Sequence, residues 1–288
     1  MSLIRASIKA LRPKQWSKNG LLLVAMVFAQ KYDEPDAVVA VGQGLLIFCM
    51  LSSAGYLVND IRDIDNDRHH PDKKHRPLAS GQLSVGMAWA LVVVLVVGGL
   101  GGSWVLLPTG FLVTAAAYLF TTLTYSARFK HSPILDVMGI AAGFILRAVA
   151  GAEAISVESS PWFLTCIAFG ALFIGLSKRL AEIKLLDEHA GSHRRVLEEY
   201  SVDLLRQLIT VTTACSLISY ALYTFDRDPG RGMMLTIPFV IYGVFRYLYL
   251  VDRKNLGGEP SAILLGDRPM QLCMLLFFVT AVCSLPSV

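Results

Sequence analysis

Charged side chains are scarce in this sequence, and long stretches of it contain none. Asp, Glu, Lys and Arg make up 17% of its 288 residues, whereas a typical soluble domain carries about 25%. Leu83–Leu107, Gly232–Phe245 and Met270–Val288 have no charged residue. Roughly 20 apolar residues span the hydrocarbon core of a bilayer, and these stretches are apolar on every side rather than along one stripe. The scarcity of charge excludes a soluble protein and predicts a membrane protein.

Other features are also missing. The five cysteines show no disulfide or zinc-site spacing, so we interpret them as small buried side chains. The first apolar run is followed by Lys31 and Asp33 without a small-residue cleavage site, so we expect no cleavable signal peptide. No low-complexity segment or soluble domain interrupts the chain. We therefore expect one transmembrane domain over residues 1–288.

The apolar stretches predict an all-α fold that crosses the membrane nine times. The connections between the helices differ in length. The two longest, Asn59–Ser84 and Ser177–Leu204, follow the second and the sixth predicted helix and therefore lie on the same side of the membrane. The nine predicted helices are Asn19–Gln30, Ala37–Val58, Val85–Leu106, Thr109–Tyr125, Ile134–Ala152, Pro161–Leu176, Leu205–Phe225, Met233–Val251 and Pro269–Leu285.

The cations fall mostly on one side of these helices. The N-terminal segment and the connection after every even-numbered helix are rich in Lys and Arg, whereas the opposite side has only Lys31, Arg227 and Arg231. Because Lys and Arg are enriched in cytoplasmic loops, we expect the N-terminus in the cytoplasm and the C-terminus outside, in the cell membrane. The net charge of +4 then reflects topology and requires no nucleic-acid partner.

An acidic cluster follows the second predicted helix. Asn59, Asp63 and Asp67 are spaced four apart, and Asp60 is seven residues before Asp67. A four-residue step advances only about 40° around a helix, so these side chains share a face while Asp65 points elsewhere. Their mutual repulsion favours a bound cation, and hard oxygen ligands suit Mg²⁺. The cluster predicts a magnesium site; the alternative is a solvated acidic loop at a helix end.

Basic residues come directly after the cluster. Lys73 and Arg76 are the strongest phosphate-binding candidates among them, because a metal–diphosphate carries more negative charge than the metal neutralises. They could instead be ordinary cytoplasmic cations. The nearby histidines, His69, His70 and His75, could bind zinc, but no cysteine or helical histidine pair accompanies them. The segment therefore favours a magnesium–diphosphate site at the membrane surface.

Two further places hold candidates, one on the cytoplasmic side and one inside a predicted span. Tyr125 and Lys130 close the fourth helix and Asp136 begins the fifth, so the first two could contact a phosphate and Asp136 could orient the lysine; an interfacial aromatic with snorkelling cations is the alternative. Arg147 lies within a span, where an arginine usually faces a polar cavity or an acidic partner. It is a substrate-site candidate, and the alternative is a structural pair with Glu153 or with a polar group of another helix.

The sixth helix and the N-terminal segment carry the remaining candidates. Lys178 and Glu182 are four residues apart, with Arg179 between them, so they form either a second phosphate pocket or a helical ion pair. Lys14 and Lys18 accompany an interfacial Trp, which suits lipid headgroups or a lipid-phosphate substrate.

Taken together, these residues resemble the UbiA superfamily of intramembrane prenyltransferases. The resemblance covers essentially the whole chain and depends on Asn59/Asp60/Asp63/Asp67 after the second helix, Arg76-Pro77-Leu78, Tyr125-Ser126 with Lys130, and nine spans. Most members have a second aspartate-rich motif after the sixth helix, where this chain has Lys178-Arg179-Leu180-Ala181-Glu182. That departure fits a donor with an additional phosphate.

The departure is similar to one branch of the superfamily, which uses decaprenyl phosphate as acceptor and phosphoribosyl pyrophosphate as donor for cell-wall arabinan synthesis. Leu11–Trp16 and Val196–Ser201 also resemble this branch. The resemblance implies a Mg²⁺-dependent phosphoribosyltransferase in which Asp63, Asp67 and Arg76 are catalytic and Asn59 and Asp60 complete the metal ligands. Neither a monomer nor a homo-oligomer is excluded.

Two other functions remain open from the sequence. The first keeps the enzyme class but transfers a prenyl group from a prenyl diphosphate to an aromatic or glycerol-type acceptor. The second is a transporter of an anionic solute, whose charged groups would gather near the membrane midplane. Here the charged groups gather at one membrane face and only Arg147 lies deep inside a span, which favours an enzyme.

Overall fold

The structure, a computed structural model, describes residues 3–69, 73–188, 195–227, 232–254, 263 and 266–284. His70, Arg231 and Leu285, which enter the predictions above, lie outside these ranges. All regular elements in the described ranges are helices, so the predicted all-α class is confirmed. The chain divides into two compact units, residues 1–159 and residues 160–288, and each is described by itself.

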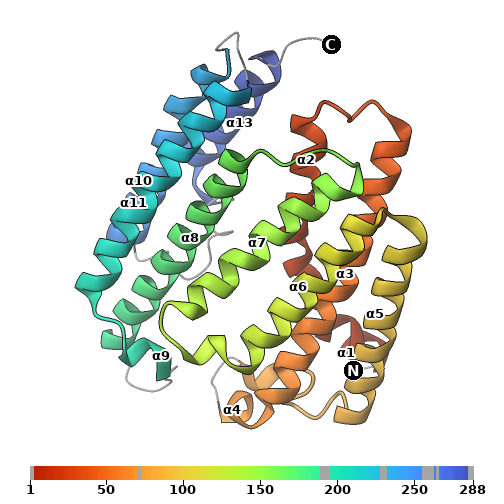
Figure 1. Ribbon diagram of the computed structural model, residues 1–288. Coiled ribbons are helices and arrows are strands. Elements are labelled where there is room, and N and C mark those ends of the chain that lie inside the picture. The colour runs from red at the N-terminus through yellow and green to blue at the C-terminus, as the bar shows by residue number, and fades with distance from the viewer. Residues whose placement is uncertain are drawn as a thin grey trace. The chain divides into compact units, whose positions relative to one another are not determined.

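The first unit is a bundle of helices that lie side by side (Figure 1). Its core helices α3, α5, α6 and α7 are preceded by a short 3-10 segment, η1, that runs into α2. The elements of this unit are α1 (Leu3–Ala10), η1 (Pro13–Leu21), α2 (Leu22–Phe28), α3 (Pro35–Arg62), α4 (Ile64–His69), η2 (Lys73–His75), α5 (Val85–Leu106), α6 (Thr109–Ala127), η3 (Phe129–His131) and α7 (Leu135–Ala154).

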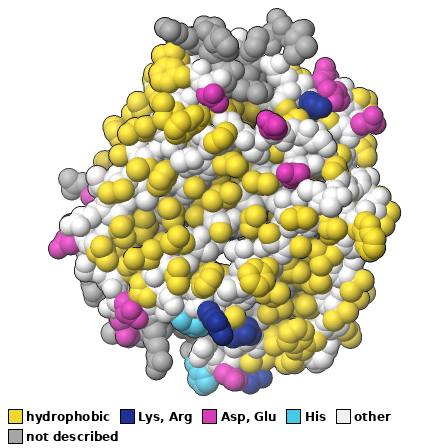
Figure 2. Space-filling view, in the orientation of Figure 1, with side chains coloured by type: hydrophobic (Ala, Val, Ile, Leu, Met, Phe, Trp, Pro, Cys, Tyr) yellow, Lys and Arg dark blue, Asp and Glu magenta, His cyan; other side chains and the backbone are white. Residues whose placement is uncertain are grey.

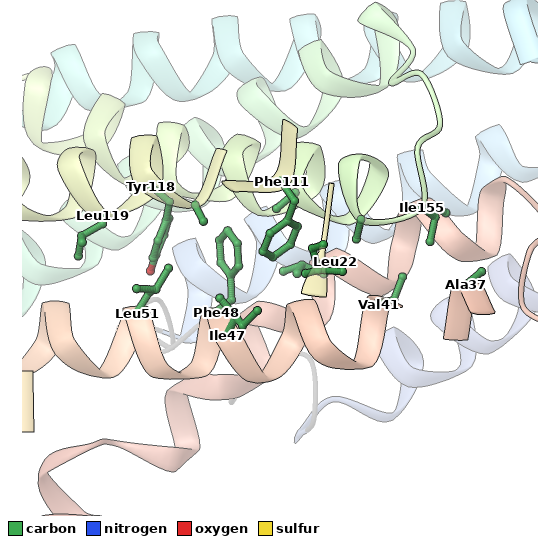
Figure 3. Close-up of a cluster of buried hydrophobic side chains, with 14 residues drawn as sticks. Leu22, Ala37, Val41, Ile47, Phe48, Leu51, Phe111, Tyr118, Leu119 and Ile155 are labelled. Atoms are coloured by element: carbon green, nitrogen blue, oxygen red, sulfur yellow. The ribbon is translucent and has the colours of Figure 1, made fainter. Parts of the chain in front are cut away.

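Aromatic and aliphatic side chains fill the interior of this bundle (Figure 3). Phe48 of α3 packs edge-on against Phe111 of α6, with ring centroids 5.7 Å apart, and its centroid is 4.9 Å from that of Tyr118. Gly44 leaves room for the Phe111 ring, because a Cβ there would lie 2.9 Å from Cε2 of Phe111. Close helix approach through small residues is typical of membrane bundles.

A second buried cluster anchors the loop that follows the acidic motif. Leu78 and Leu83 of this loop pack with Leu57 of α3 and Ala88 of α5, and all four are buried. Ser84 then caps α5 by accepting a hydrogen bond from the backbone N–H of Met87 at 3.2 Å, as N-cap serines commonly do. Arg76 lies two residues before this anchor, so the loop returns it to the end of α3.

The second unit packs α8 against α10 and α11 against α13 (Figure 1). Aromatic rings join α8 to its neighbours: Phe163 is 5.4 Å from Tyr223 of α10, and Phe173 is 5.3 Å from Tyr247 of α11, between ring centroids. The elements of this unit are α8 (Pro161–Glu188), α9 (Arg195–Glu198), α10 (Val202–Arg227), η4 (Gly232–Thr236), α11 (Ile237–Lys254) and α13 (Arg268–Ser284).

Seven helical segments in the described ranges are long and apolar enough to cross a membrane. They start at Pro35, Val85, Thr109, Leu135, Pro161, Val202 and Gly232. The predicted helix at 19–30 is instead the end of η1 followed by the seven residues of α2, and α13 has 17 residues. Large hydrophobic side chains such as Val97 and Trp104 are exposed, and Figure 2 shows a face covered mainly by hydrophobic side chains, as expected of a surface in contact with lipid.

Two predicted boundaries were wrong in a way that affects the site. The second predicted helix was expected to end at Val58, but α3 continues to Arg62, so Asn59 and Asp60 lie on its last turn. The sixth was expected to end at Leu176, but α8 continues to Glu188, so Lys178–Glu182 lies inside a helix. Polar residues were read as the ends of these helices, although a helix can continue beyond the membrane where its polar residues meet water.

Candidate active site

The acidic motif lies where α3 ends and α4 begins. Asn59 donates a hydrogen bond from Nδ2 to Oδ2 of Asp63 at 3.1 Å, so the predicted four-residue alignment of this pair is confirmed. Asp63 has non-helical backbone angles and separates the two helices, but its carbonyl still accepts from the backbone N–H of Asp67 at 2.8 Å. Asp65 faces away and pairs with Arg68, as expected.

Two arginines from different segments meet the buried carboxylate of Asp60. This residue is only 2% exposed, and its Oδ1 accepts hydrogen bonds from Arg12 and, at 3.1 Å, from Arg76. The same Nη1 of Arg76 also donates to Oδ2 of Asp67 at 2.6 Å. Arg76 therefore bridges the two aspartates that are seven residues apart, and the sequence prediction that it acts beside the acidic motif agrees with this placement.

Lys130 completes the cluster from a third segment. It belongs to η3, between α6 and α7, and is 4% exposed. Its Nζ lies 2.5 Å from Oδ1 of Asp63 and 3.3 Å from Oδ1 of Asn59. Asp136, in the first turn of α7, is fully buried. The fold thus brings η3 to the acidic motif across 67 residues of sequence.

The cluster is balanced in charge, because Asp60, Asp63 and Asp67 are neutralised by Arg12, Arg76 and Lys130. Within the described ranges, no group of three or more His, Cys, Asp or Glu side chains is arranged to hold a metal ion, since each of these carboxylates is turned toward a cation. The oxygen ligands themselves suit Mg²⁺, which needs only one or two carboxylates when waters and substrate phosphates complete its shell. The residues therefore fit a magnesium–diphosphate if the cations exchange carboxylate for phosphate oxygens.

Arg12 is a residue of this cluster that the sequence analysis did not assign. Its backbone has φ 54° and ψ 60°, a left-handed conformation uncommon for residues other than glycine. Its guanidinium carbon lies 5.1 Å from the ring centroid of Tyr56, and such cation–π contacts are favourable. In the sequence, Pro13 indicated only that a helix ends near Arg12, because a residue before proline is disfavoured in the right-handed helical region; it did not indicate the left-handed backbone or the contact with Asp60.

The other predicted residues of this unit lie elsewhere around the site. Lys14 and Lys18 are exposed on η1, and Lys73 is partly exposed at the start of η2. Tyr125 packs its ring against Gly139 of α7, where a Cβ would lie 2.9 Å from its Cδ2. The zinc alternative gains no support from His69 or His75, which belong to no metal-binding group among the described residues.

Arg147 is buried within α7, and its hydrogen-bond partners in the described ranges are neutral. Its guanidinium donates to Oδ1 of Asn19 at 2.8 Å, to the carbonyl of Gly143 at 2.8 Å and to the hydroxyl of Tyr118 at 2.7 Å. The structural alternative is therefore confirmed as a contact with polar groups of other segments, whereas the pairing with Glu153 was wrong. The carboxylate of Glu153 instead packs on Gly110 at the start of α6.

The second unit holds the other predicted phosphate contacts. Arg179 is 2% exposed, and its Nη1 donates to Oε2 of Glu182 at 2.6 Å. The ion pair that the sequence left open as the alternative for this segment is therefore present, and the second phosphate pocket stays a prediction. Lys178 is partly exposed on the neighbouring position, and the hydroxyl of Ser177 is buried without a hydrogen-bond partner in the described structure.

The five cysteines are all free, as predicted, but they are not all buried. Cys49 and Cys273 are buried, Cys166 and Cys215 are partly exposed, and Cys283 is exposed. Cys283 lies near the end of α13, where a small apolar side chain is tolerated on a lipid-facing surface.

The chain is similar to known proteins over nearly its whole length. It is 37% identical over 286 residues to decaprenyl-phosphate phosphoribosyltransferase from Mycobacterium tuberculosis, covering 97% of this chain and 94% of that protein. It is 39% identical over 279 residues to the protein of the same name from Corynebacterium glutamicum, covering 93% and 83%.

Solved structures show the same fold. A UbiA homologue from Archaeoglobus fulgidus, bound to GPP and Mg²⁺, matches with a TM-score of 0.74 at 20% identity, covering 97% of this chain and 99% of that one. The sequence model of the UbiA prenyltransferase family matches residues 20–283 of this chain. The chain is therefore an integral membrane protein that belongs to the UbiA prenyltransferase family.

Proposed function

We propose that this protein transfers 5-phosphoribose from phosphoribosyl pyrophosphate to a polyprenyl (decaprenyl) phosphate and releases pyrophosphate, in the synthesis of cell-wall arabinan precursors. The observation that carries the proposal is the 35–39% identity, over nearly the full chain, to relatives named decaprenyl-phosphate phosphoribosyltransferase. The charge-balanced cluster around Asp60, Asp63 and Asp67 supports it, because such a cluster suits the diphosphate of the donor.

The acidic motif would hold the donor's diphosphate through magnesium. Asn59, Asp60, Asp63 and Asp67 supply the oxygen ligands, and a Mg²⁺ ion bound there neutralises charge on the leaving group. Arg76 lies between Asp60 and Asp67 at 3.1 and 2.6 Å, so it is placed to turn from carboxylate to pyrophosphate oxygens. Lys130 can make the same exchange from Asp63. Both cations then stabilise the negative charge that develops on pyrophosphate.

The bond changes need no strong general base. The C1–O bond to pyrophosphate breaks, its electron pair leaves with pyrophosphate, and an oxygen of the acceptor phosphate forms the new C1–O bond. The acceptor is already an anion, so no proton has to be removed from it. An oxocarbenium-like transition state is typical of glycosyl transfer, and attack from the face opposite to pyrophosphate inverts the anomeric centre.

The remaining candidates would bind phosphate groups or support those that do. In the second unit, Lys178 and Arg179 carry the charge to bind the ribose 5-phosphate or the acceptor phosphate, with Glu182 orienting Arg179. In the first unit, Asp136 would support Lys130. The other proposed substrate-binding residues are Lys14, Lys18, Lys73 and Tyr125, and Arg147 would support the site through its contacts with Asn19 and Tyr118.

The proposed arrangement in the membrane is a single UbiA-like transmembrane domain over residues 1–288 with nine spans. The seven long apolar segments would be seven of these spans. The two shorter spans would be η1 together with α2, and α13. The distribution of Lys and Arg supports a cytoplasmic N-terminus, an external C-terminus and an active site on the cytoplasmic side of the cell membrane.

Transfer is tested directly with purified protein, Mg²⁺, phosphoribosyl pyrophosphate labelled in the ribose and polyprenyl phosphate. The proposal predicts label in the lipid fraction, loss of that label with EDTA, and its return when Mg²⁺ is restored. No label in the lipid, together with prenyl transfer from a prenyl diphosphate to an aromatic or glycerol-type acceptor, would overturn it. Solute flux without any transfer would point to a transporter instead.

A further inference from the structure

The C-terminal half of α3 carries polar side chains along one face. Cys49, Ser53, Tyr56 and Asp60 follow one another at steps of three or four residues, and Ser52 is three residues after Cys49 at the edge of the same face. Of these, Ser52, Ser53 and Asp60 are almost fully buried. Buried polar groups in a membrane bundle require partners, and for this face the partners come from the N-terminal segment.

The N-terminal segment contacts this face turn by turn. Ser53 Oγ lies within hydrogen-bond distance of two acceptors, the carbonyl of Leu11 at 3.0 Å and that of Cys49 at 2.7 Å, and it accepts from Nε1 of Trp16 at 3.0 Å. Nδ2 of Asn19 donates to Oγ of Ser52 at 3.3 Å and to Sγ of Cys49 at 3.4 Å. Arg12, at the other end of the segment, reaches Asp60. The segment from Arg12 to Asn19 therefore lies along α3, with Arg12 at Asp60 and Asn19 about three turns away at Cys49 and Ser52.

Arg147 of α7 contacts the Asn19 end of this segment. Asn19 is fully buried, and its Oδ1 accepts from Nε of Arg147 at 2.8 Å. Nη2 of the same guanidinium donates to the hydroxyl of Tyr118 of α6 at 2.7 Å, and Cζ lies 4.7 Å from the centroid of the Tyr118 ring. A planar guanidinium can meet three acceptors at fixed angles, so this one side chain joins α6, α7 and the N-terminal segment.

A second contact on α7 fixes the same segment without any charge. Gly151 is one turn beyond Arg147 on the same face, and an added Cβ there would collide with the backbone of Leu22, at its Cα, carbonyl carbon and carbonyl oxygen. Arg147 and Gly151 thus hold residues three apart, Asn19 and Leu22, at the point where η1 passes into α2. The close approach of backbone to Gly151 requires that the segment lie where Arg147 holds it.

We propose that Arg147 is a positioning residue, which fixes the N-terminal segment on α3 and α7 and thereby places the Arg12 guanidinium on Asp60. Its three hydrogen-bond acceptors in the described structure are neutral, so its role is to set geometry rather than to neutralise a carboxylate. The left-handed backbone of Arg12 is a conformation that persists only where the surroundings over-determine it, and the contacts from Leu11 to Asn19 supply that constraint. The consequence for substrate binding rests on the function proposed above.

The position of the segment can be followed through Trp16. We would replace Trp89, Trp104 and Trp162, all exposed at 41–78%, with Phe so that Trp16 is the remaining tryptophan. In this background Arg147→Gln is expected to raise acrylamide quenching of Trp16 about threefold and to weaken binding of Mn²⁺–pyrophosphate about tenfold. Tyr118→Phe is the matched control: it removes one acceptor of Arg147 but leaves Asn19 bonded, so Trp16 quenching should change little.

Coupling to Arg12 separates positioning from direct contact with substrate. If Arg147 acts through Arg12, then Arg12→Gln and the double variant with Arg147→Gln bind Mn²⁺–pyrophosphate equally weakly, because coupled residues are not additive. Additive losses, or unchanged Trp16 quenching in a folded Arg147→Gln protein, would overturn the proposal. Neither readout requires ribose transfer, so a chain that transfers another group would still give the predicted result.

Two further variants keep the test decisive if Arg147→Gln does not fold. Asn19→Ala removes the neutral acceptor and Gly151→Ala pushes on the backbone of Leu22, and each is expected to raise Trp16 quenching and lower Mn²⁺–pyrophosphate affinity in the same ratio as Arg147→Gln would. Arg147→Lys retains the positive charge but lacks the planar guanidinium. Compared with Arg147→Gln, it should rescue less than half of the lost affinity for Mn²⁺–pyrophosphate. Full rescue by lysine would show that charge alone matters and would contradict positioning.

Discussion

The acidic motif of the first unit and the Lys178–Glu182 segment of the second pair their charged side chains differently. In the first, Asp60, Asp63 and Asp67 meet cations from distant segments, the N-terminal segment, the loop after α4 and η3. In the second, Arg179 meets Glu182 one turn away on the same helix. Pairs between separate elements can be exchanged for a ligand while every helix stays intact, whereas a local pair fixes one guanidinium in one direction. The first unit is thus suited to binding a metal–diphosphate, and the second to presenting a fixed cation.

The largest expected effect tests whether the paired carboxylates of the first unit are chemically active. Asp63→Asn should lower the rate of phosphoribosyl transfer about 10²- to 10³-fold, as loss of a group that stabilises transition-state charge typically does. Initial rates at saturating substrate measure this. Asp65→Asn is the matched control, because Asp65 is exposed and pairs only with Arg68 in the described structure, and it should change the rate less than about twofold. Equal losses of transfer rate in Asp63→Asn and Asp65→Asn would contradict a specific role of Asp63 in the reaction.

A second prediction concerns how the charge-balanced cluster admits a metal. Because three cations already neutralise Asp60, Asp63 and Asp67, free Mn²⁺ should bind weakly, and pyrophosphate should raise its affinity about 100-fold by drawing the cations to phosphate oxygens, a coupling within the usual range. Mn²⁺ electron paramagnetic resonance titrations with and without pyrophosphate measure the two affinities. Tight Mn²⁺ binding that pyrophosphate does not alter would contradict the exchange of partners.

A smaller effect is expected from the fixed cation of the second unit. Arg179→Gln should raise the KM for phosphoribosyl pyrophosphate or for polyprenyl phosphate about tenfold, the usual loss when a charge-assisted hydrogen bond is removed, with kcat changed less. Lys184→Gln is its control on the same helix, because Lys184 pairs with Asp252. Circular dichroism of both variants establishes that they are folded. An unchanged KM for both substrates in Arg179→Gln would leave Arg179 with a structural role alone.

The smallest effect should come from the partner of that cation. Glu182→Gln removes a helical ion pair whose carboxylate side chain is 27% exposed, and such pairs contribute only a few tenths of a kcal/mol. The KM that responds to Arg179→Gln should therefore change by about twofold. A larger change in Glu182→Gln than in Arg179→Gln would show that the carboxylate, rather than the guanidinium, contacts the ligand.

The sequence predicted local features well. The four-residue spacing of Asn59 and Asp63 predicted their contact, and the spacing of Arg179 and Glu182 predicted their ion pair, because both follow from helix periodicity. α5 spans Val85–Leu106, the bounds that the sequence predicted for the third helix. The family resemblance depended on these same local motifs, and the comparisons confirm it.

The long-range contacts could not be predicted in the same way. Arg12 and Lys130 reach the acidic cluster across 48 and 67 residues, distances over which helix periodicity carries no information. For Arg147, a polar group of another helix was one of the expected partners, but helix periodicity could not identify Asn19 and Tyr118 as the groups that meet its guanidinium. The ends of α3 and α8 were placed too early because polar residues also occupy helical turns outside the apolar stretch.

A competition between two donors tests the central claim most directly. Purified protein would be given phosphoribosyl pyrophosphate labelled with ¹⁴C in the ribose and a ³H-labelled prenyl diphosphate together, with polyprenyl phosphate and an aromatic acid as acceptors and Mg²⁺ present. The account predicts ¹⁴C in the polyprenyl phosphate product, no ³H in the aromatic product, and loss of the ¹⁴C product in Asp63→Asn. Prenylation of the aromatic acid without ¹⁴C in the lipid would contradict it.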